Sequence, residues 1–140
     1  IDSVWDMHKN KNNDLTIFSN NIDGMGFAIF KSTSLIKSHK MGTARHRSEL
    51  CDLYIKENYK HFKVEHIKYK KQNINYRLTV DNPEDLILCK KLFMKHHKDY
   101  PLISTKKIIL SLRKLKKEVK LTKKFIAKSK SINNLWKYVK

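Results

Sequence analysis

The feature that most constrains the fold is the segment of residues 76–86, which reads YRLTVDNPEDL. Residues 77–80 combine β-branched and apolar side chains and predict a short buried strand. A helix start follows at once. Asn82 suits the N-cap, Pro83 suits the first helical position, and Glu84 and Asp85 place negative charge in the first turn. The segment therefore predicts a strand that runs directly into a helix.

One carboxylate, that of Asp81, lies between the predicted strand and the predicted helix. In open α/β sheets, ligands bind just outside the carboxyl ends of strands, so Asp81 is placed where a metal or substrate is expected. Mg²⁺ prefers carboxylate oxygens and needs only one or two, because water and phosphate supply the rest. Alternatively, Asp81 only satisfies backbone N–H groups at the helix start. We interpret Glu84 and Asp85 as capping and dipole residues.

Strand and helix patterns alternate along the rest of the chain, which indicates an α/β fold. Strands are predicted over residues 14–18, 26–30 and 62–67, and helices over 2–12, 32–40, 45–58, 83–97 and 105–115. Turns are predicted at 20–24 and 72–73. The α/β unit is predicted to end at Pro101, and a final amphipathic segment includes residues 125–139. With three glycines, the chain has no glycine-rich phosphate loop and no dinucleotide fingerprint.

Several apolar side chains are predicted to face inward at helical spacing. They are Ile36, Leu86, Leu92, Phe93 and the two cysteines, Cys51 and Cys89. Trp5 is expected in the core or at an interface. Neither cysteine has a partner at metal-ligand spacing, so we interpret both as small buried hydrophobic residues in a reducing compartment.

A second candidate site is the cluster of Arg45, Arg47 and Glu49 at the start of the helix predicted over 45–58. Basic residues oppose the helix dipole there, which favours an anionic ligand, whereas the alternative is a solvated helix terminus. Arg77 faces away from Leu78 and either meets a phosphate or carboxylate or is solvated; from the sequence, the solvated interpretation is favoured.

The net charge is +18, and it is concentrated near the C-terminus. Residues 103–140 carry 13 basic residues and one acidic residue. Such a charge suggests an anionic partner, and one alternative function is a basic nucleic-acid-binding module. However, Lys, Asn and Ile are all abundant, as an AT-rich genome produces, and there is no recognisable nucleic-acid-binding motif. We therefore do not expect nucleic acid as the main partner. No apolar run approaches the ~18 residues of a membrane span.

Residues 77–86 resemble the "VDTPEDL" segment near the C-terminus of the cytidylyltransferases that activate acidic sugars. These are the acylneuraminate and Kdo cytidylyltransferases and the related spore-coat polysaccharide biosynthesis protein F family. Residues 46–58 with residues 62–64, and residues 12–16 with Asp23 and Gly24, are similar to the spore-coat branch. The resemblance covers about residues 1–97 and weakens toward residue 125.

The resemblance implies the C-terminal half of a nucleotide-diphospho-sugar transferase-like (Rossmann-like) α/β sandwich, over residues 1–102, with a Lys-rich helical extension over 103–140. It implies transfer of CMP from CTP to a sugar or sugar acid, with release of pyrophosphate, for surface polysaccharide or glycan synthesis. By resemblance, Asp81 holds Mg²⁺. Arg45, Arg47, Glu49 and Arg77 are candidates for contacts to the substrate, and the first three also for a homodimer contact.

Two departures from the family pattern matter. The family's N-terminal half, with its CTP-binding arginine and lysine motif and a first metal aspartate, has no counterpart here, so we expect a fragment of a longer protein that is inactive by itself. Ala28 lies about where the spore-coat branch has an acidic residue. A further alternative is therefore a non-catalytic paralogue that only dimerises. We expect a cytoplasmic protein.

Overall fold

The structure, a computed structural model, describes residues 1–19, 22–47, 51–68, 76–99 and 102–132. Contacts between Cα atoms divide the chain into two compact units. The first contains the described residues of 1–20 and 26–70, and the second contains those of 21–25 and 71–134. The boundary expected between residues 102 and 103 concerns the extent of a cytidylyltransferase domain and stays a prediction.

The first unit is built on a three-stranded mixed sheet in the order β2-β1-β3. Strand β1 (Leu15–Ser19) pairs antiparallel with β2 (Phe27–Phe30) and parallel with β3 (Val64–Lys68). All three strands are rich in β-branched and aromatic residues, which pack well on a pleated surface. The three strands predicted in this unit are confirmed, with boundaries shifted by one or two residues.

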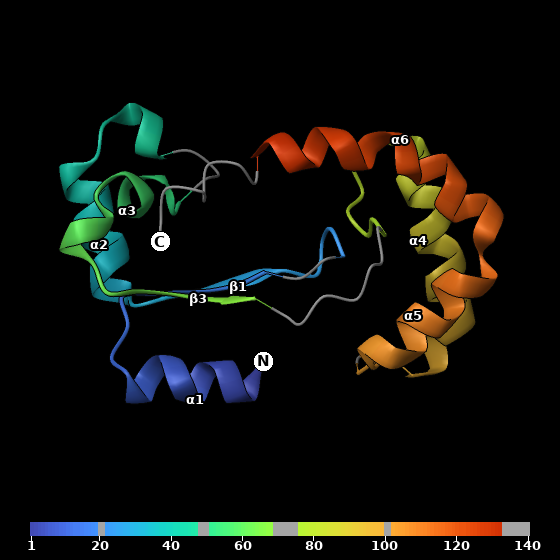
Figure 1. Cartoon of the computed structure of the whole chain (residues 1–140), viewed down its shortest axis with the longest axis horizontal. Coiled ribbons are helices and arrows are strands. Elements are labelled where there is room, and N and C mark those ends of the chain that lie inside the picture. The colour runs from blue at the N-terminus through green and yellow to red at the C-terminus, as the bar shows by residue number, and fades with distance from the viewer. Residues whose placement is uncertain (20–21, 48–50, 69–75, 100–101, 133–140) are drawn as a thin grey trace. The chain divides into compact units, whose positions relative to one another are not determined.

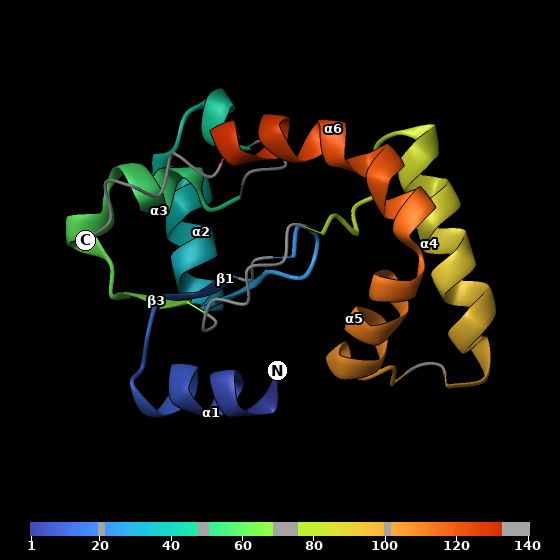
Figure 2. The ribbon, with the colours of Figure 1, turned by 45° about the vertical axis from the view of Figure 1, so that its right-hand side comes forward.

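Helices cover both faces of this sheet (Figures 1 and 2). Helix α1 (Asp2–Asn10) lies on one face, whereas α2 (Ser32–Met41) and α3 (Leu53–Glu57) lie on the other. The short 3-10 helices η1 (Ala44–Arg47) and η2 (Tyr59–His61) flank α3 in sequence. Buried Leu15, Ile17, Ile55 and Phe62 form the core cluster of this unit. The predicted α/β class is therefore confirmed.

The predicted continuous helix over 45–58 is wrong in the part that the structure describes. That part contains the 3-10 helix η1 and the short helix α3, and residues 51–52 form a turn directly before α3. Cys51 in this turn is exposed, contrary to the prediction that it is buried. A cysteine at a turn has no helical face to direct it inward.

Trp5 is 48% exposed, so its core interpretation is wrong, and the interface alternative stays a prediction. The prediction that Ile36 is buried is also wrong, because Ile36 is 54% exposed. Serines take the inward positions of α2 instead, because the Ser34 hydroxyl donates to Asp14 Oδ1 (2.6 Å) and the Ser38 hydroxyl to the Ser34 carbonyl (2.8 Å). Ser32 is the first helical residue of α2, and no side chain caps that end.

A buried polar cluster beneath β1 makes the stability of this unit depend on pH. His8 Nδ1 and Thr16 Oγ1 are hydrogen-bonded at 2.9 Å, and Asn13 Nδ2 donates to the same oxygen. Burial lowers the pKa of His8 below its ordinary value of 6.5 and outweighs the opposing charge of Asp14. The unfolded chain therefore binds the proton at a higher pH than the folded chain does. The stability that neutral His8 contributes is complete above the ordinary pKa of 6.5 and is lost as the pH falls below it.

We expect the free energy of unfolding to fall as the pH is lowered from about 7 to about 5, because the unfolded chain gains the proton first. The substitution His8→Gln should make this pH dependence shallower. Urea unfolding at a series of pH values measures it. The exposed His39→Gln serves as the control, and an equal change in both variants would contradict the assignment to His8.

The second unit packs α4 (Pro83–His96) against α5 (Thr105–Lys114) and α6 (Lys116–Ile132), as Figure 2 shows, with the 3-10 helix η3 (His97–Asp99) following α4. Its core cluster contains buried Leu88, Leu92, Leu112 and Val119. Ser104 caps α5, and its hydroxyl accepts from the Lys107 N–H at 3.3 Å. No helix in the described part of the chain is long and apolar enough to cross a bilayer.

Two predictions in the second unit are wrong. Residues 77–80 do not form a strand; they contribute one isolated parallel bridge, between Arg77 and Asp23. Leu86 and Phe93 face outward and are 56% and 57% exposed, whereas Leu92 is buried as predicted, and Leu88 is buried as well. Cys89 is half-buried, close to its predicted environment. The predicted turn at 72–73, Pro101 and residues 133–139 lie outside the described residues.

Candidate functional site

The candidate site lies where the bridge at Arg77 leads into helix α4. The N-terminus of α4 carries a capping box between Asn82 and Asp85, with Pro83 in the first turn. The Asn82 N–H donates to Asp85 Oδ2 at 3.1 Å, and the Asp81 N–H donates to the same oxygen at 3.2 Å. The local sequence therefore fixes the backbone at Asp81 and Asn82, as the cap signals predict.

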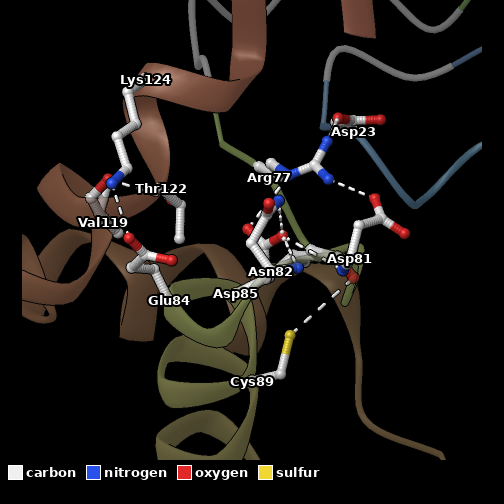
Figure 3. Close-up of polar contacts among 11 residues, drawn as sticks. Asp23, Arg77, Asp81, Asn82, Glu84, Asp85, Cys89, Val119, Thr122 and Lys124 are labelled. Carbon is white, nitrogen blue, oxygen red and sulfur yellow. Dashed lines mark hydrogen bonds and ion pairs between the residues drawn. The ribbon is translucent and has the colours of Figure 1, made fainter. Parts of the chain in front are cut away.

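Arg77 joins three carboxylates through its three side-chain nitrogens, and Figure 3 shows the arrangement. Its Nε donates to Asp85 Oδ1 at 3.1 Å and its Nη1 to Asp23 Oδ2 at 2.7 Å. Its Nη2 pairs with Asp81 Oδ2. We call Arg77, Asp23, Asp81 and Asp85 the Arg77 cluster. The favoured interpretation from the sequence, a solvated Arg77, is therefore wrong, because its side chain is only 6% exposed.

Backbone contacts hold Asp23 beside Arg77. The Asp23 N–H donates to the Tyr76 carbonyl at 3.0 Å, and the Leu78 N–H donates to the Asp23 carbonyl at 2.7 Å. Gly24 follows with φ at +89°, the left-handed conformation predicted for an Asp-Gly turn. No side chain fits at Gly24, because a Cβ would lie 2.8 Å from the Leu78 carbonyl carbon. The two segments are thus packed backbone against backbone.

The three carboxylates of the Arg77 cluster differ sharply in exposure. The side chain of Asp85 is 0% exposed, that of Asp23 is 24% exposed and that of Asp81 is 66% exposed. One guanidinium faces three carboxylates, so the cluster carries an excess of negative charge. The exposed end of this cluster is therefore the carboxylate of Asp81.

The electrostatics of the buried members favour their charged forms. Burial opposes the charge on Arg77, but hydrogen bonds and charges from Asp85 and Asp23 outweigh it and raise the pKa of the guanidinium. Burial also opposes the charge on Asp85, but hydrogen bonds from Asn82 and Arg77 outweigh it and lower the pKa of that carboxyl. Both groups are therefore ionised at neutral pH, and their pairing is maintained.

Asp85, and not Asp81, performs the capping role at this helix start. Asp85 Oδ2 accepts the backbone N–H groups of Asp81 and Asn82, which confirms the prediction that Asp85 is a capping residue. The side chain of Asp81 accepts only from Arg77 among the described residues, and through one oxygen. The alternative role considered for Asp81, that of satisfying backbone N–H groups at the helix start, is thus performed by Asp85.

The donor set around Asp81 fits a partial metal site. Among the described residues, no group of three or more His, Cys, Asp or Glu side chains is arranged to hold a metal. All three carboxylates of the Arg77 cluster contact Arg77, and Asp81 is the most exposed of them, at 66%. Mg²⁺ requires only one or two protein carboxylates when phosphates and water complete its shell. The residues present therefore fit one ligand of such a site.

The other predicted site residues lie in the first unit. Arg45 Nη2 donates to both carboxylate oxygens of Glu57, at 2.7 and 2.8 Å, and His46 Nε2 lies 2.8 Å from Glu57 Oε2. Arg47 donates to the carbonyls of His39 and Gly42, which end helix α2. Both arginines thus have partners within the chain. Glu49 lies outside the described residues.

Two lysines, Lys91 and Lys124, form ion pairs within the second unit. Lys124 of α6 pairs with Glu84 at the start of α4 at 2.6 Å, and Lys91 of α4 pairs with Glu118 of α6. These pairs link α4 to α6, and of the two lysines only Lys124 belongs to the basic region of residues 103–140.

The structure therefore brings Arg77 and Asp81 together in one unit. Arg45 and Arg47 lie in the other unit, where they contact different groups. Sequence reasoning missed two members of the Arg77 cluster as partners of Arg77, namely Asp23 and Asp85. The contact between Arg77 and Asp85 could have been predicted from the local sequence, because a carboxylate that caps a helix lies close to the residues just before that helix. Comparisons with models of known protein families, with curated proteins and with solved structures find no match.

Proposed function

We propose that this chain contributes a magnesium-ligating carboxylate, that of Asp81, to a cytidylyltransferase. The enzyme would transfer CMP from CTP to a sugar or sugar acid and release pyrophosphate. The resemblance of residues 77–86, 46–58 and 12–24 supplies the reaction class. The observation that supports Asp81 is its position: it is 66% exposed at the end of the Arg77 cluster and has no capping role.

The proposed role matches the chemistry of the donor set. When bound, Mg²⁺ neutralises negative charge on the α-phosphate and on the leaving pyrophosphate as the sugar hydroxyl attacks. Asp81 would supply one oxygen ligand, and the nucleotide phosphates and water would supply others. The remaining protein ligands and the CTP-binding groups of the family have no counterpart in these 140 residues, so we propose that another part of a longer protein supplies them.

The other members of the Arg77 cluster would hold Asp81 in place. Asp85 fixes the backbone of Asp81 through its N–H group, and Arg77 orients the side chain through Oδ2. A ligand held from both its backbone and its side chain loses little freedom when it binds a cation, which favours binding. We further propose a nucleotide-diphospho-sugar transferase-like fold and a homodimer, and a cytoplasmic location stays a prediction.

The proposal is tested with the protein expressed from its complete open reading frame. Pyrophosphate release is measured with CTP, saturating Mg²⁺ and a panel of acidic and amino sugars. We expect Asp81→Ala to lower turnover about tenfold or more, because the cation loses a ligand. Asp2→Ala, which removes an exposed carboxylate from the first turn of α1, is the matched control and should retain turnover.

Two results would count against the proposal. If Asp81→Ala retains more than about a tenth of wild-type turnover at saturating Mg²⁺, Asp81 is not the metal ligand. If the folded wild-type protein releases no pyrophosphate with any sugar of the panel, the alternative of a non-catalytic dimerising paralogue replaces the enzyme.

A further inference from the structure

Helix α6 of the second unit, orange to red in Figure 2, exposes lysines along one side. Between residues 116 and 126, six residues are exposed, and all but Leu121 are lysines. At 3.6 residues per turn, the lysines fall within about 120° of the helix circumference. The opposite side is buried in the unit through Val119, Thr122 and Ile126. We call the exposed lysines the lysine face; they are Lys116, Lys117, Lys120, Lys123 and Lys124.

Carboxylates of the described residues leave most of this charge uncompensated. Glu84 pairs with Lys124, as Figure 3 shows. Glu118 is the one acidic residue in the sequence of α6, and it pairs with Lys91 of α4 instead of with the lysine face. The other four members of the lysine face have no carboxylate partner in the described part of the chain. The surface therefore carries a concentrated positive charge.

This arrangement opposes the stability of the helix that carries it. Lys120 lies three or four positions from each of the other lysines of the face, and like charges at these spacings repel each other. Lys116 and Lys117 also lie in the first turn of α6, where positive charge opposes the helix dipole. A bound anion would relieve both effects. The lysine face is thus better suited to an anionic partner than to the stability of the isolated helix.

The general abundance of lysine in the chain does not by itself account for this surface. A compositional bias of the kind that an AT-rich genome produces raises asparagine together with lysine. Residues 103–132, however, contain ten lysines and no asparagine. The positive charge of this segment is therefore a feature of its own.

The length of the lysine face fits a partner with closely repeated charges. From Lys116 to Lys124 the helix rises about 12 Å, because each residue adds about 1.5 Å. A nucleic-acid duplex presents about seven phosphate charges over this distance. A single small anion cannot contact lysines at both ends of the face. A polyanion can therefore use the whole surface.

The composition of the lysine face favours nucleic acid over other polyanionic partners. Binding to the surface of an anionic bilayer usually combines basic residues with apolar side chains that enter the bilayer, and here Leu121 alone, 46% exposed, lies beside the lysines between residues 116 and 126. Interfaces between proteins are depleted in lysine, whereas interfaces with nucleic acid are rich in positive charge.

We propose that the lysine face of α6 binds the phosphate backbone of a nucleic-acid duplex without reading its sequence. Lysine ammonium groups act on phosphates as point charges and carry no base preference. The one aromatic residue between residues 116 and 126, Phe125, is half-buried, and Lys124 Nζ lies 4.9 Å from the centre of its ring. This accessory surface does not depend on the proposed transfer of CMP or on Asp81.

The test follows the fluorescence anisotropy of a labelled DNA duplex of about 20 base pairs, titrated with the 140-residue chain at several NaCl concentrations. The lysine-face variant combines Lys116→Gln, Lys120→Gln and Lys123→Gln. These lysines are exposed, and glutamine removes the charge with little change in helix propensity. Far-ultraviolet circular dichroism checks that the variant is folded.

The matched control combines Lys40→Gln, Lys60→Gln and Lys98→Gln. These three lysines are exposed, lie on α2, η2 and η3, and have no ion pair in the described part of the chain. The control therefore has the same net charge as the lysine-face variant, and only the position of the removed charges differs.

We expect the lysine-face variant to bind the duplex about tenfold or more weakly than wild type at about 50 mM NaCl. Each lost phosphate contact also lowers the slope of log affinity against log salt by about 0.9, so the slope should become shallower by about 2–3. The control should stay within about threefold of wild type with an unchanged slope, because its lysines are far less concentrated on one surface. Unlabelled duplexes of two unrelated sequences should compete equally well.

Four results would overturn the proposal. Wild type does not bind the duplex at about 50 mM NaCl, or the control loses as much affinity as the lysine-face variant, which would make net charge the cause. One competitor sequence is strongly preferred, so that bases are read. Vesicles of equal parts phosphatidylserine and phosphatidylcholine bind wild type more tightly than the duplex does, and the lysine-face variant loses that binding, so that a bilayer is the partner. If the triple variant does not fold, Lys120→Gln against Lys60→Gln decides, with an expected slope change of about 0.9 for Lys120→Gln alone.

Discussion

Replacing Arg77 with methionine is expected to lower the free energy of unfolding by about 3–5 kcal/mol, the usual effect of removing one partner from a buried ion pair. Asp85 is completely buried, and without Arg77 its charge would lose its only cationic partner among the described residues. Asp23 and Asp81 would repel each other and Asp85 in the same small volume. Urea unfolding followed by far-ultraviolet circular dichroism measures the change.

Arg45→Met is the matched control for this prediction. Arg45 also pairs with a carboxylate, that of Glu57, but its side chain is 65% exposed. Exposed ion pairs contribute about 0–1 kcal/mol, so this variant should unfold close to the wild type. Equal losses in the two variants would mean that the burial of the Arg77 cluster has no energetic consequence.

The start of helix α4 could be predicted from the sequence because its determinants are local. Asn82, Pro83 and Asp85 lie within four consecutive positions, and each acts on backbone groups of the same turn. The cap of α5 at Ser104 could be predicted for the same reason. The strands of the first unit could also be predicted, because alternation and β-branched composition are properties of a few neighbouring residues.

The environment of Arg77 could not be predicted from its neighbours. One partner, Asp23, lies 54 residues away in sequence, and no local pattern connects the two. Residues 77–80 have the composition of a strand, but a strand also needs a partner strand beside it. Asp23 supplies a single bridge before the left-handed turn at Gly24, so the ladder does not continue. The strand-like composition of residues 77–80 is therefore not sufficient to form a strand.

The orientation of α4 shows a similar limit. Its apolar residues, which are Leu86, Leu88, Cys89, Leu92 and Phe93, do not all lie on one face, and periodicity alone does not choose which of them are buried. Asp85 decides, because its capping bonds and its ion pair with Arg77 direct position 85 inward. Positions 88 and 92 follow at helical spacing and become buried. A buried carboxylate thus sets the rotation of the helix.

Gly24→Ala is expected to destabilise the protein by about 2–4 kcal/mol, since a left-handed φ disfavours a side chain by about 1–2 kcal/mol and overpacking adds a similar amount. The observed φ is +89°, and the new Cβ would lie 2.8 Å from the Leu78 carbonyl carbon and 2.9 Å from the Thr79 nitrogen. Both are backbone atoms, so a side-chain rotation cannot relieve the contact. Urea unfolding measures the loss.

Gly26→Ala provides the control, because Gly26 is exposed and its φ is not positive. Reducing the freedom of the unfolded chain at such a position is neutral or stabilises by up to about 1 kcal/mol. A stable Gly24→Ala variant would show that the segment containing Asp23 can shift away from Leu78. Such a shift would also move Asp23 away from Arg77. Loss of stability with Gly24→Ala alone, and not with Gly26→Ala, instead identifies the backbone contact at Gly24 as the element that fixes the Arg77 cluster.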